Sequence, residues 1–587
     1  MWQFFKYVLA TIVGLLLFFF IGFILLIGIA SVASSDKEVS IDENSVLELK
    51  LDKPIAERKT NDPFTDLGIP MVGVRNDLGL QEIKDAIRKA KTDANIKGIY
   101  LDVTRVQAGM ATLEEIRNEL LNFKKSGKFI VAYNDLCSEK SYYLNSVADK
   151  IYLNPAGTLE FNGLSSEVVF FKGMFEKLDI QPYIFKVGEF KSAVEPFFLD
   201  KMSEPSRLQT TAFLNSLNTF ALQNIAKSRK LPFEKMKAVS DSMLVHNADD
   251  ALKYGLVTNL GYFDEALDFM KKKTGTELKK ELNLISLKKY EKVKPEDEES
   301  GRNRIAVIYA SGDIVDGDGD EDNIGGTKYA EAIRKARLDD KVKAVVLRIN
   351  SGGGSALASD VMWREVMLTK KVKPIIASMG DVAASGGYYM AMACDTIVAH
   401  PNTITGSIGV FGVLANFEDF LKNKIGVTVD RVKTGRFSDV PTVTRDMTDY
   451  EKQTIQHEVE RIYADFTTKA AQGRNMPVAE LQKIASGRVW SGIEAKQHGL
   501  VDVFGGLDDA VKLAAAAAKL KEGDYRVRRL PAQKGFMEQL MSGFQDQARA
   551  SMIETELGEN YRYLQMIRKL KTLNGIQARL PFEMQIQ

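Results

Sequence analysis

The chain has 587 residues, long enough for several domains, and its 45% apolar and 27% charged residues are typical of a folded globular protein. Lys and Arg number 79 against 78 Asp and Glu, and the resulting net charge of +1 gives no support to nucleic-acid binding, which needs a basic footprint. The two cysteines and four histidines lack metal-ligand spacing. We therefore expect no metal, no cofactor and no nucleic-acid partner.

The N-terminal segment predicts a membrane anchor over residues 1–36. Between Lys6 and Asp36 lie 29 uncharged, mostly apolar residues, enough to cross a bilayer as one helix. The positive-inside rule places the N-terminus in the cytoplasm and the remaining chain on the outer side. A cleaved signal peptide is the alternative, because Ser31-Val32-Ala33 resembles a cleavage site, but such peptides have shorter apolar regions. We expect a retained single-pass anchor.

The rest of the chain contains an internal duplication. IKGIYLDV from Ile96 matches VKAVVLRI from Val342 at an offset of 246, and the Tyr-Tyr pairs at 142–143 and 388–389 keep that offset. KVGEF from Lys186 matches KTGRF from Lys433 at an offset of 247. Each copy alternates apolar β-branched runs with helix-like stretches, which is typical of βαβ units around a parallel sheet. The body therefore consists of two α/β repeats.

Composition sets the expected domain boundaries. Nine of the twelve residues from Lys288 to Glu299 are charged, which is typical of a solvated linker. The C-terminal part mixes basic and apolar residues at helical spacing, and we expect a packing helix there, with a membrane surface or a neighbouring subunit as alternative contacts. The predicted domains are a first repeat over 44–290, a linker over 291–303, a second repeat over 304–530 and a helical extension over 531–587.

The two repeats differ at two positions that bear on chemistry. Ser385 lies in GDVAASGGYYMA, where a strand is expected to end near Met379 and a helix to begin around Ser385. The first repeat has Glu139 at the matching position. Conversely, Lys191 follows KVGEF in the first repeat, whereas Ser438 follows KTGRF in the second. One repeat thus holds a serine and the other a lysine, and a shared site would need both.

A serine hydroxyl needs a base to become a nucleophile, and histidine is scarce here. Lysine can act as the base only when it is neutral, so we expect Lys191 to be buried without a carboxylate partner. Pairing of Lys191 with Glu189 or Glu195 would weaken this hypothesis. The alternatives are an N-cap role for Ser385 and a solvated surface position for Lys191.

Glycine-rich segments supply candidate donors for an oxyanion. RINSGGGS follows an apolar run, and Gly353 and Gly354 let the backbone approach a substrate closely because they have no Cβ. Gly386 follows Ser385 directly and offers a further N–H. A phosphate cradle or a plain turn is the alternative for such a segment.

The segments RINSGGGS, GDVAASGGYYMA, TGSIGV and GEFKSAVEPF resemble the long form of the signal peptide peptidase A family, also called protease IV, over about residues 46–520. The resemblance implies a Clp protease/crotonase-like fold, catalysis by Ser385 and Lys191, and a lysine-orienting Ser407. It also implies homotetramers, a periplasmic body on the bacterial inner membrane, and degradation of leftover signal peptides. Gly352 departs from the proline that is usual in the family.

We therefore expect an α/β protein with tandem duplicated Clp protease/crotonase-like domains after one N-terminal transmembrane helix. The expected function is a membrane-anchored serine endopeptidase, with a Ser/Lys dyad split across the repeats, that degrades apolar peptides. A catalytically inactive peptide-binding scaffold is the alternative. A crotonase-like acyl-CoA enzyme is less favoured, because it would need a cytoplasmic cofactor pool and leaves the Ser/Lys split unexplained. The sequence leaves open whether the dyad forms within one chain or between chains.

Overall fold

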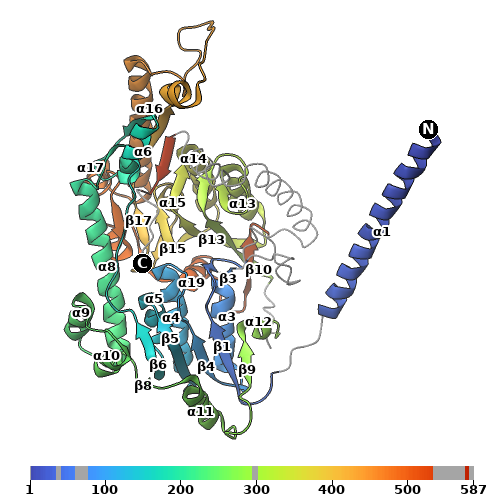
Figure 1. Cartoon of the computed structure of the whole chain (residues 1–587). Helices are drawn as coiled ribbons and strands as arrows, with labels where there is room; N and C mark the ends of the chain where they lie inside the picture. The colour runs from blue at the N-terminus through green and yellow to red at the C-terminus, as the bar shows by residue number, and fades with distance from the viewer. Residues whose placement is uncertain (1, 35–40, 60–76, 294–301, 533–575, 581–587) are drawn as a thin grey trace.

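The structure is a computed structural model that describes residues 2–34, 41–59, 77–293, 302–532 and 576–580 (Figure 1). Two α/β repeats make up the body, and each is centred on a largely parallel sheet. The α/β class and the tandem arrangement that the duplication predicts are both present.

The sheet of the first repeat has the order β8-β6-β5-β4-β1-β9, and its pairs are parallel. Its strands are apolar and mostly buried because helices cover both faces. The strands are β1 (Ser45–Lys50), β4 (Ile96–Asp102), β5 (Phe129–Cys137), β6 (Lys150–Leu159), β8 (Asn259–Leu260) and β9 (Leu284–Ser286). The helices include α3 (Leu80–Thr92), α4 (Met110–Lys124), α5 (Glu139–Asn145), α6 (Lys172–Lys177), α7 (Glu195–Phe198), α8 (Glu204–Arg229), α9 (Phe233–Asp241), α10 (Ala248–Lys253), α11 (Phe263–Thr274) and α12 (Leu287–Tyr290).

The second repeat reproduces this order as β20-β16-β15-β13-β10-β21, and β15 also pairs with β17, which pairs with β19. The strands are β10 (Asn303–Ser311), β13 (Val342–Ser351), β15 (Ile375–Ala384), β16 (Thr396–Ala399), β17 (Ile404–Gly406), β19 (Val489–Ser491), β20 (Val503–Phe504) and β21 (Tyr525–Leu530). The helices include α13 (Gly326–Leu338), α14 (Ala356–Lys370), α15 (Gly386–Ala391), α16 (Asp449–Gly473), α17 (Val478–Ile484), α18 (Gly492–Gln497) and α19 (Leu507–Ala517).

Strand β15 is longer than the sequence predicts. The expected end near Met379 is wrong, because the strand continues to Ala384 and stops directly before Ser385. The register of the β13–β15 pair shifts between Ile349 and Ser351, and pairing resumes there with Ala383. Such an irregularity bends a strand without ending it. The bent strand carries the chain to the start of α15.

A third sheet joins the repeats in the order β12-β11-β14-β22-β18-β7. Strand β7 (Gln181–Lys186) belongs to the first repeat and pairs antiparallel with β18 (Phe411–Asn416) of the second. The remaining strands are β11 (Asp313–Val315), β12 (Asn323–Gly325), β14 (Gly353–Ser355) and β22 (Ile576–Arg579). The pairing of β7 with β18 directs the chain that follows β7 into the second repeat.

The expectations for the ends and the linker are tested only in part. In the linker, residues 294–301 lie outside the described residues, as do 533–575 and 581–587 of the extension. The prediction of a helical extension is wrong for Ile576–Arg579, which forms strand β22 because its backbone pairs with β14 and β18.

The N-terminal segment forms helix α1 (Trp2–Ser34). Within the part of the chain that the structure describes, no helix combines the length and the apolar character needed to cross a membrane. The predicted transmembrane anchor therefore stays a prediction.

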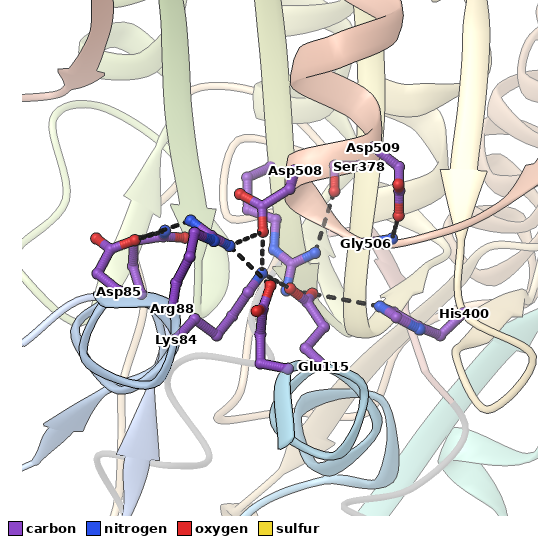
Figure 2. A network of polar contacts seen from close by, with 12 residues as sticks. Lys84, Asp85, Arg88, Glu115, Ser378, His400, Gly506, Asp508 and Asp509 are labelled. Carbon is purple, nitrogen blue, oxygen red and sulfur yellow. Dashed lines mark hydrogen bonds and ion pairs between the residues drawn. The ribbon is translucent and has the colours of Figure 1, made fainter. Parts of the chain in front are cut away.

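A buried cluster of charges lies where the two repeats meet (Figure 2). Glu115, on α4 of the first repeat, forms an ion pair with Lys84 from α3 and another at 2.8 Å with Arg348 from β13 of the second repeat. Lys84 also pairs with Asp508 at the start of α19, 2.9 Å away. Because these partners come from both repeats, the cluster fixes one repeat against the other.

Candidate active site

Lys191 and Ser385 come from different repeats and meet in one buried site. The Lys191 Nζ lies 2.8 Å from the Ser385 Oγ, and neither residue is exposed to solvent. Both residues belong to the same chain. The structure therefore brings the predicted pair together within one chain.

Ser385 sits at a sharp turn between β15 and α15. Its backbone adopts φ 54° and ψ −113°, a conformation that costs a non-glycine residue about 1–3 kcal/mol. Two backbone hydrogen bonds hold the turn, since the Ser385 N–H donates to the Gly406 carbonyl and the Tyr389 N–H donates to the Ser385 carbonyl, each at 2.8 Å. The Ser385 Oγ also lies 3.3 Å from the Gly409 carbonyl oxygen. The turn projects the hydroxyl toward Lys191.

Lys191 enters the second repeat from the segment that follows β7. The fit is close, because a Cβ on Gly487 would lie 2.7 Å from the Lys191 backbone nitrogen. A Cβ on Gly409 would lie 3.2 Å from the Lys191 Cδ. Gln209 of α8 ties this segment to the second repeat, since its side chain donates to the Phe190 carbonyl at 3.0 Å and accepts from the Val489 N–H at 3.1 Å.

Burial shifts the pKa of Lys191. Desolvation lowers the pKa of its amine well below the ordinary value, and no opposing charge compensates. The two acidic neighbours in sequence are engaged elsewhere or exposed: Glu195 accepts hydrogen bonds from Ser203, and Glu189 faces solvent. The condition that the sequence hypothesis places on Lys191, burial without a carboxylate, is met.

Ser407 completes the surroundings of the amine. The Lys191 Nζ lies 3.0 Å from the Ser407 Oγ and 3.3 Å from the Ser407 carbonyl oxygen. A neutral amine has two N–H donors and one lone pair. The two N–H groups can donate to the Ser407 oxygens, which leaves the lone pair for the Ser385 hydroxyl. Ser407 itself is held by its N–H, which donates to the Arg488 carbonyl at 2.7 Å.

The three predicted oxyanion glycines lie beside the site, but they are not equivalent. The Gly353 N–H donates to the Ser351 Oγ at 3.1 Å, so its predicted role as an oxyanion donor is not supported by its contacts. Gly354 pairs with Ala578 of β22. The Gly386 N–H lies at the start of α15 and has no acceptor within that helix. The roles of Gly354 and Gly386 as oxyanion donors stay predictions.

Neither Ser385 nor Lys191 has a chemically equivalent residue at the matching position of the other repeat. Glu139 stands at the start of α5, and its carboxylate accepts from the N–H groups of Asn162 and Gly163 at 2.9 and 2.7 Å. Ser438, which matches Lys191, is exposed and bonds only locally to the Gly435 carbonyl. Each repeat supplies one half of a single site.

Sequence reasoning missed several residues that shape the site. Gly409 and Gly487 approach Lys191 closely, and Ser351 engages Gly353. Strand β22 also borders the glycines. Apart from the local Ser351–Gly353 hydrogen bond, these contacts join segments that are distant in the chain, and no local pattern in the sequence signals them.

A serine hydroxyl, a buried lysine amine without a counter-charge and a helix N-terminus in one site are components of a serine hydrolase. Comparison with protein families agrees: the model of peptidase family S49 matches the chain twice, over residues 122–277 and 367–521. The chain therefore belongs to peptidase family S49 and is a serine protease of that family.

Three relatives that are similar in sequence point the same way. The chain is 37% identical to Protease 4 of Haemophilus influenzae, over 84% of this chain and 83% of that protein. It is 37% identical to Protease 4 of Salmonella typhi, over 80% and 77%. It is 36% identical to the chloroplastic serine protease SPPA of Arabidopsis thaliana, over 76% and 66%. The solved structure of a mutant membrane-bound stomatin-specific protease is similar to 40% of this chain over 99% of its own length, at 14% identity and a TM-score of 0.25.

Proposed function

We propose that the chain is a serine endopeptidase in which Ser385 is the nucleophile and neutral Lys191 is the general base. The observation that carries this proposal is the 2.8 Å contact between a fully buried amine without a carboxylate partner and a serine hydroxyl. The Lys191 lone pair takes the hydroxyl proton as Oγ attacks the peptide carbonyl carbon. The Gly386 N–H donates to the oxyanion that develops.

The same amine also serves the remaining steps, which are departure of the leaving peptide and hydrolysis of the ester. Protonated Lys191 gives its proton to the nitrogen of the leaving peptide, and the C–N bond breaks. A water molecule, deprotonated by the neutral amine, then hydrolyses the ester on Ser385. Ser407 keeps the amine aimed at Ser385 through both steps, because its two oxygens occupy the N–H groups.

The proposed substrates are peptides with apolar segments, such as cleaved signal peptides. An apolar cluster lies against Ala384, directly before the nucleophile, and includes Phe213, Leu217, Ile404 and Val489. Phe411, the first residue of β18, is buried near Lys191, with its ring centre 5.9 Å from the Nζ. Apolar surroundings of this kind favour apolar side chains of a bound peptide.

We further propose that α1 anchors the chain in the bacterial inner membrane, with the body on the periplasmic side. The support is the uncharged stretch between Lys6 and Asp36 and the exposure of the apolar side chains at its start, including Trp2, Phe4 and Leu16. Membrane fractionation of the full chain and of a chain that begins at residue 41 tests this proposal, since only the full chain should sediment with membranes.

We also propose a homo-oligomer, with a tetramer as the expected form. The segment of the second repeat that matches the Lys191 segment is not covered in the single chain, and Val432, Val427 and Ile425 are exposed on it. A patch of exposed apolar side chains favours a protein contact. Val432→Asp should lower the mass measured by light scattering if a neighbouring subunit covers this segment.

The experiment that tests the function is cleavage of a fluorogenic apolar peptide by the full chain in detergent. Ser385→Ala should abolish cleavage, whereas the matched control Ser438→Ala, at an exposed serine, should keep wild-type activity. A wild-type chain that binds the peptide without cutting it would support the inactive scaffold instead.

A further inference from the structure

A buried glutamine holds the chain on both sides of Lys191. Gln209, on α8, is fully buried, and its amide nitrogen donates to the Phe190 carbonyl and to the Ser192 Oγ, each at 3.0 Å. Phe190 and Ser192 are the residues directly before and after Lys191. One side chain therefore fixes the backbone from which the lysine amine extends.

The oxygen of the same amide is bound to the second repeat. The Val489 N–H, at the start of β19, donates to the Gln209 Oε1 at 3.1 Å. Val489 lies opposite Gly406 in the antiparallel pair of β19 with β17. The Gly406 carbonyl in turn accepts the Ser385 N–H at 2.8 Å. Gln209 thus connects the lysine segment to the strand pair that holds the turn of the serine.

Arg488, directly before Val489, adds two further links to the same strand. Its carbonyl accepts the Ser407 N–H at 2.7 Å, so the residue that contacts the lysine amine is held by β19 as well. Its guanidinium lies over the Phe190 ring, 5.0 Å from the ring centre, and over Trp490 at 4.1 Å. The lysine segment and the Ser407 backbone are therefore tied to one short stretch of chain.

The position of Gln209 on its helix favours a connecting role. It lies on the buried face of α8 with Phe213 and Leu217, where apolar side chains pack. An amide at such a position costs free energy unless its polar groups are hydrogen-bonded. Both of its N–H groups and its oxygen are engaged here. An apolar side chain would fill the same space without joining the two segments.

We propose that Gln209 is a positioning residue that sets the distance between the Lys191 amine and the Ser385 hydroxyl. This inference rests on the proposed function. Lysine has a flexible four-carbon side chain, so the place of its amine depends on how firmly its backbone is held. Reacting groups need close alignment, and a displacement of about 1 Å can slow a reaction about 10²-fold. Without Gln209, the lysine segment can move relative to β17 and β19, and the 2.8 Å contact lengthens.

Steady-state kinetics of a matched pair of variants give the first test. Gln209→Met removes the three hydrogen bonds but keeps the length of the side chain. The kcat for the fluorogenic apolar peptide should fall about 10²-fold. KM should stay at the wild-type value, because the amide contacts only the protein's own segments. Gln223→Met, on the exposed side of the same helix, is the control and should keep both constants.

A double-mutant cycle tests whether Gln209 acts through Lys191. The readout is the rate at which a serine-reactive fluorophosphonate labels Ser385, which stays measurable when cleavage is slow. Gln209→Met should slow labelling about 10²-fold in the wild-type background but less than about twofold in the Lys191→Met background. Reductions that multiply in the double variant would overturn the proposal, because Gln209 would then act on the serine without the lysine.

Circular dichroism shows whether each variant is folded. Gln209→Asn supplies a second variant, because its amide is one methylene too short to reach both Phe190 and Val489, and its kcat should fall in the same way. Unfolding of both variants would overturn the proposal and assign Gln209 to the fold alone. A folded Gln209→Met with wild-type kcat would overturn this inference and leave the proposed function intact. A wild-type chain that neither cleaves the peptide nor labels at Ser385 would count against the proposed function itself.

Discussion

Two lysines are buried between the repeats, and their pKa values shift in opposite directions. Lys84 contacts the carboxylates of Glu115 and Asp508, whereas Lys191 contacts only hydroxyl and carbonyl oxygens. Burial alone would lower the pKa of Lys84, but the two carboxylates outweigh it and raise that pKa above its ordinary value. Burial is unopposed at Lys191, and its pKa falls well below the ordinary value.

The comparison teaches that the counter-charge, and not the depth of burial, decides what a buried lysine does. Lys84 stays charged and helps to hold the repeats together (Figure 2). Lys191 has no counter-charge, so burial favours its neutral form, which in the proposed mechanism offers a lone pair to Ser385. The same interface therefore contains a structural cation and a candidate base. The charge of the neighbouring side chains is what distinguishes the two lysines.

Removing the neutral lysine should have the largest effect. Lys191→Met keeps the apolar length of the side chain but has no lone pair, and kcat for peptide cleavage should fall about 10⁴-fold. The chain should remain folded, because the variant needs no buried amine. Steady-state kinetics and circular dichroism measure the two effects. A variant that retains a tenth of wild-type kcat would show that another group is the base.

Removing the carboxylate of Glu115 should lower the free energy of unfolding. Glu115→Gln leaves Lys84 and Arg348 without a carboxylate that both contact, and breaking a buried ion pair in this way costs about 3–5 kcal/mol. Lys335→Met is the matched control, because it breaks an exposed pair with Glu331 and should cost less than about 0.5 kcal/mol. Urea denaturation of both variants gives the comparison. Equal losses in the two would contradict the structural role of the buried cluster.

Ser407→Ala should weaken the orientation of Lys191 without removing the base. The variant loses the hydroxyl at 3.0 Å but keeps the carbonyl at 3.3 Å. A lost hydrogen bond of about 1.5 kcal/mol corresponds to roughly a tenfold lower kcat, with KM unchanged. Ser407→Thr restores a hydroxyl and should recover part of the rate. An unchanged kcat in Ser407→Ala would show that the Ser407 hydroxyl does not position Lys191.

The pH dependence of activity and of stability should reflect the lowered pKa of Lys191. Activity should rise with pH as Lys191 loses its proton and then level off, since only the neutral amine accepts a proton from Ser385. Between the folded-state pKa and the ordinary value of 10.5, the unfolded chain binds one more proton at Lys191 than the folded chain. The stability contributed by this residue should therefore rise by about 1.4 kcal/mol per pH unit in that window.

Lys191→Met provides the reference for this slope. Urea midpoints of wild type and variant across that window should converge as pH rises, because the cost of neutralising the buried amine disappears near its ordinary pKa. Parallel stability curves would mean that Lys191 stays protonated in the folded chain.

The sequence predicted the parts of the molecule that leave a repeated or reciprocal signal. The 246-residue offset predicted two α/β repeats, and the exchange of Ser385 for Glu139 and of Lys191 for Ser438 pointed to one shared site. The position of β22 had no such signal, because its partners lie more than 160 residues away and its own segment resembles part of a helix.

The buried charges were equally hidden. Lys84, Glu115 and Asp508 are individually ordinary charged residues, and a charged residue is normally assigned to the surface. Lys84 and Glu115 become buried, and Asp508 half-buried, only when α3, α4 and α19 pack together across the interface between the repeats. This packing belongs to the tertiary structure, and local patterns in the sequence do not predict it.

The most direct test of the account is the rate at which a serine-reactive fluorophosphonate labels the full chain, with the labelled residue mapped by mass spectrometry. We expect a single label on Ser385 in the wild type and a rate at least about 10³-fold slower in Lys191→Met. Labelling of Ser385 at the wild-type rate in Lys191→Met, or labelling of a different serine, would contradict the claim that a neutral lysine from one repeat activates the serine of the other.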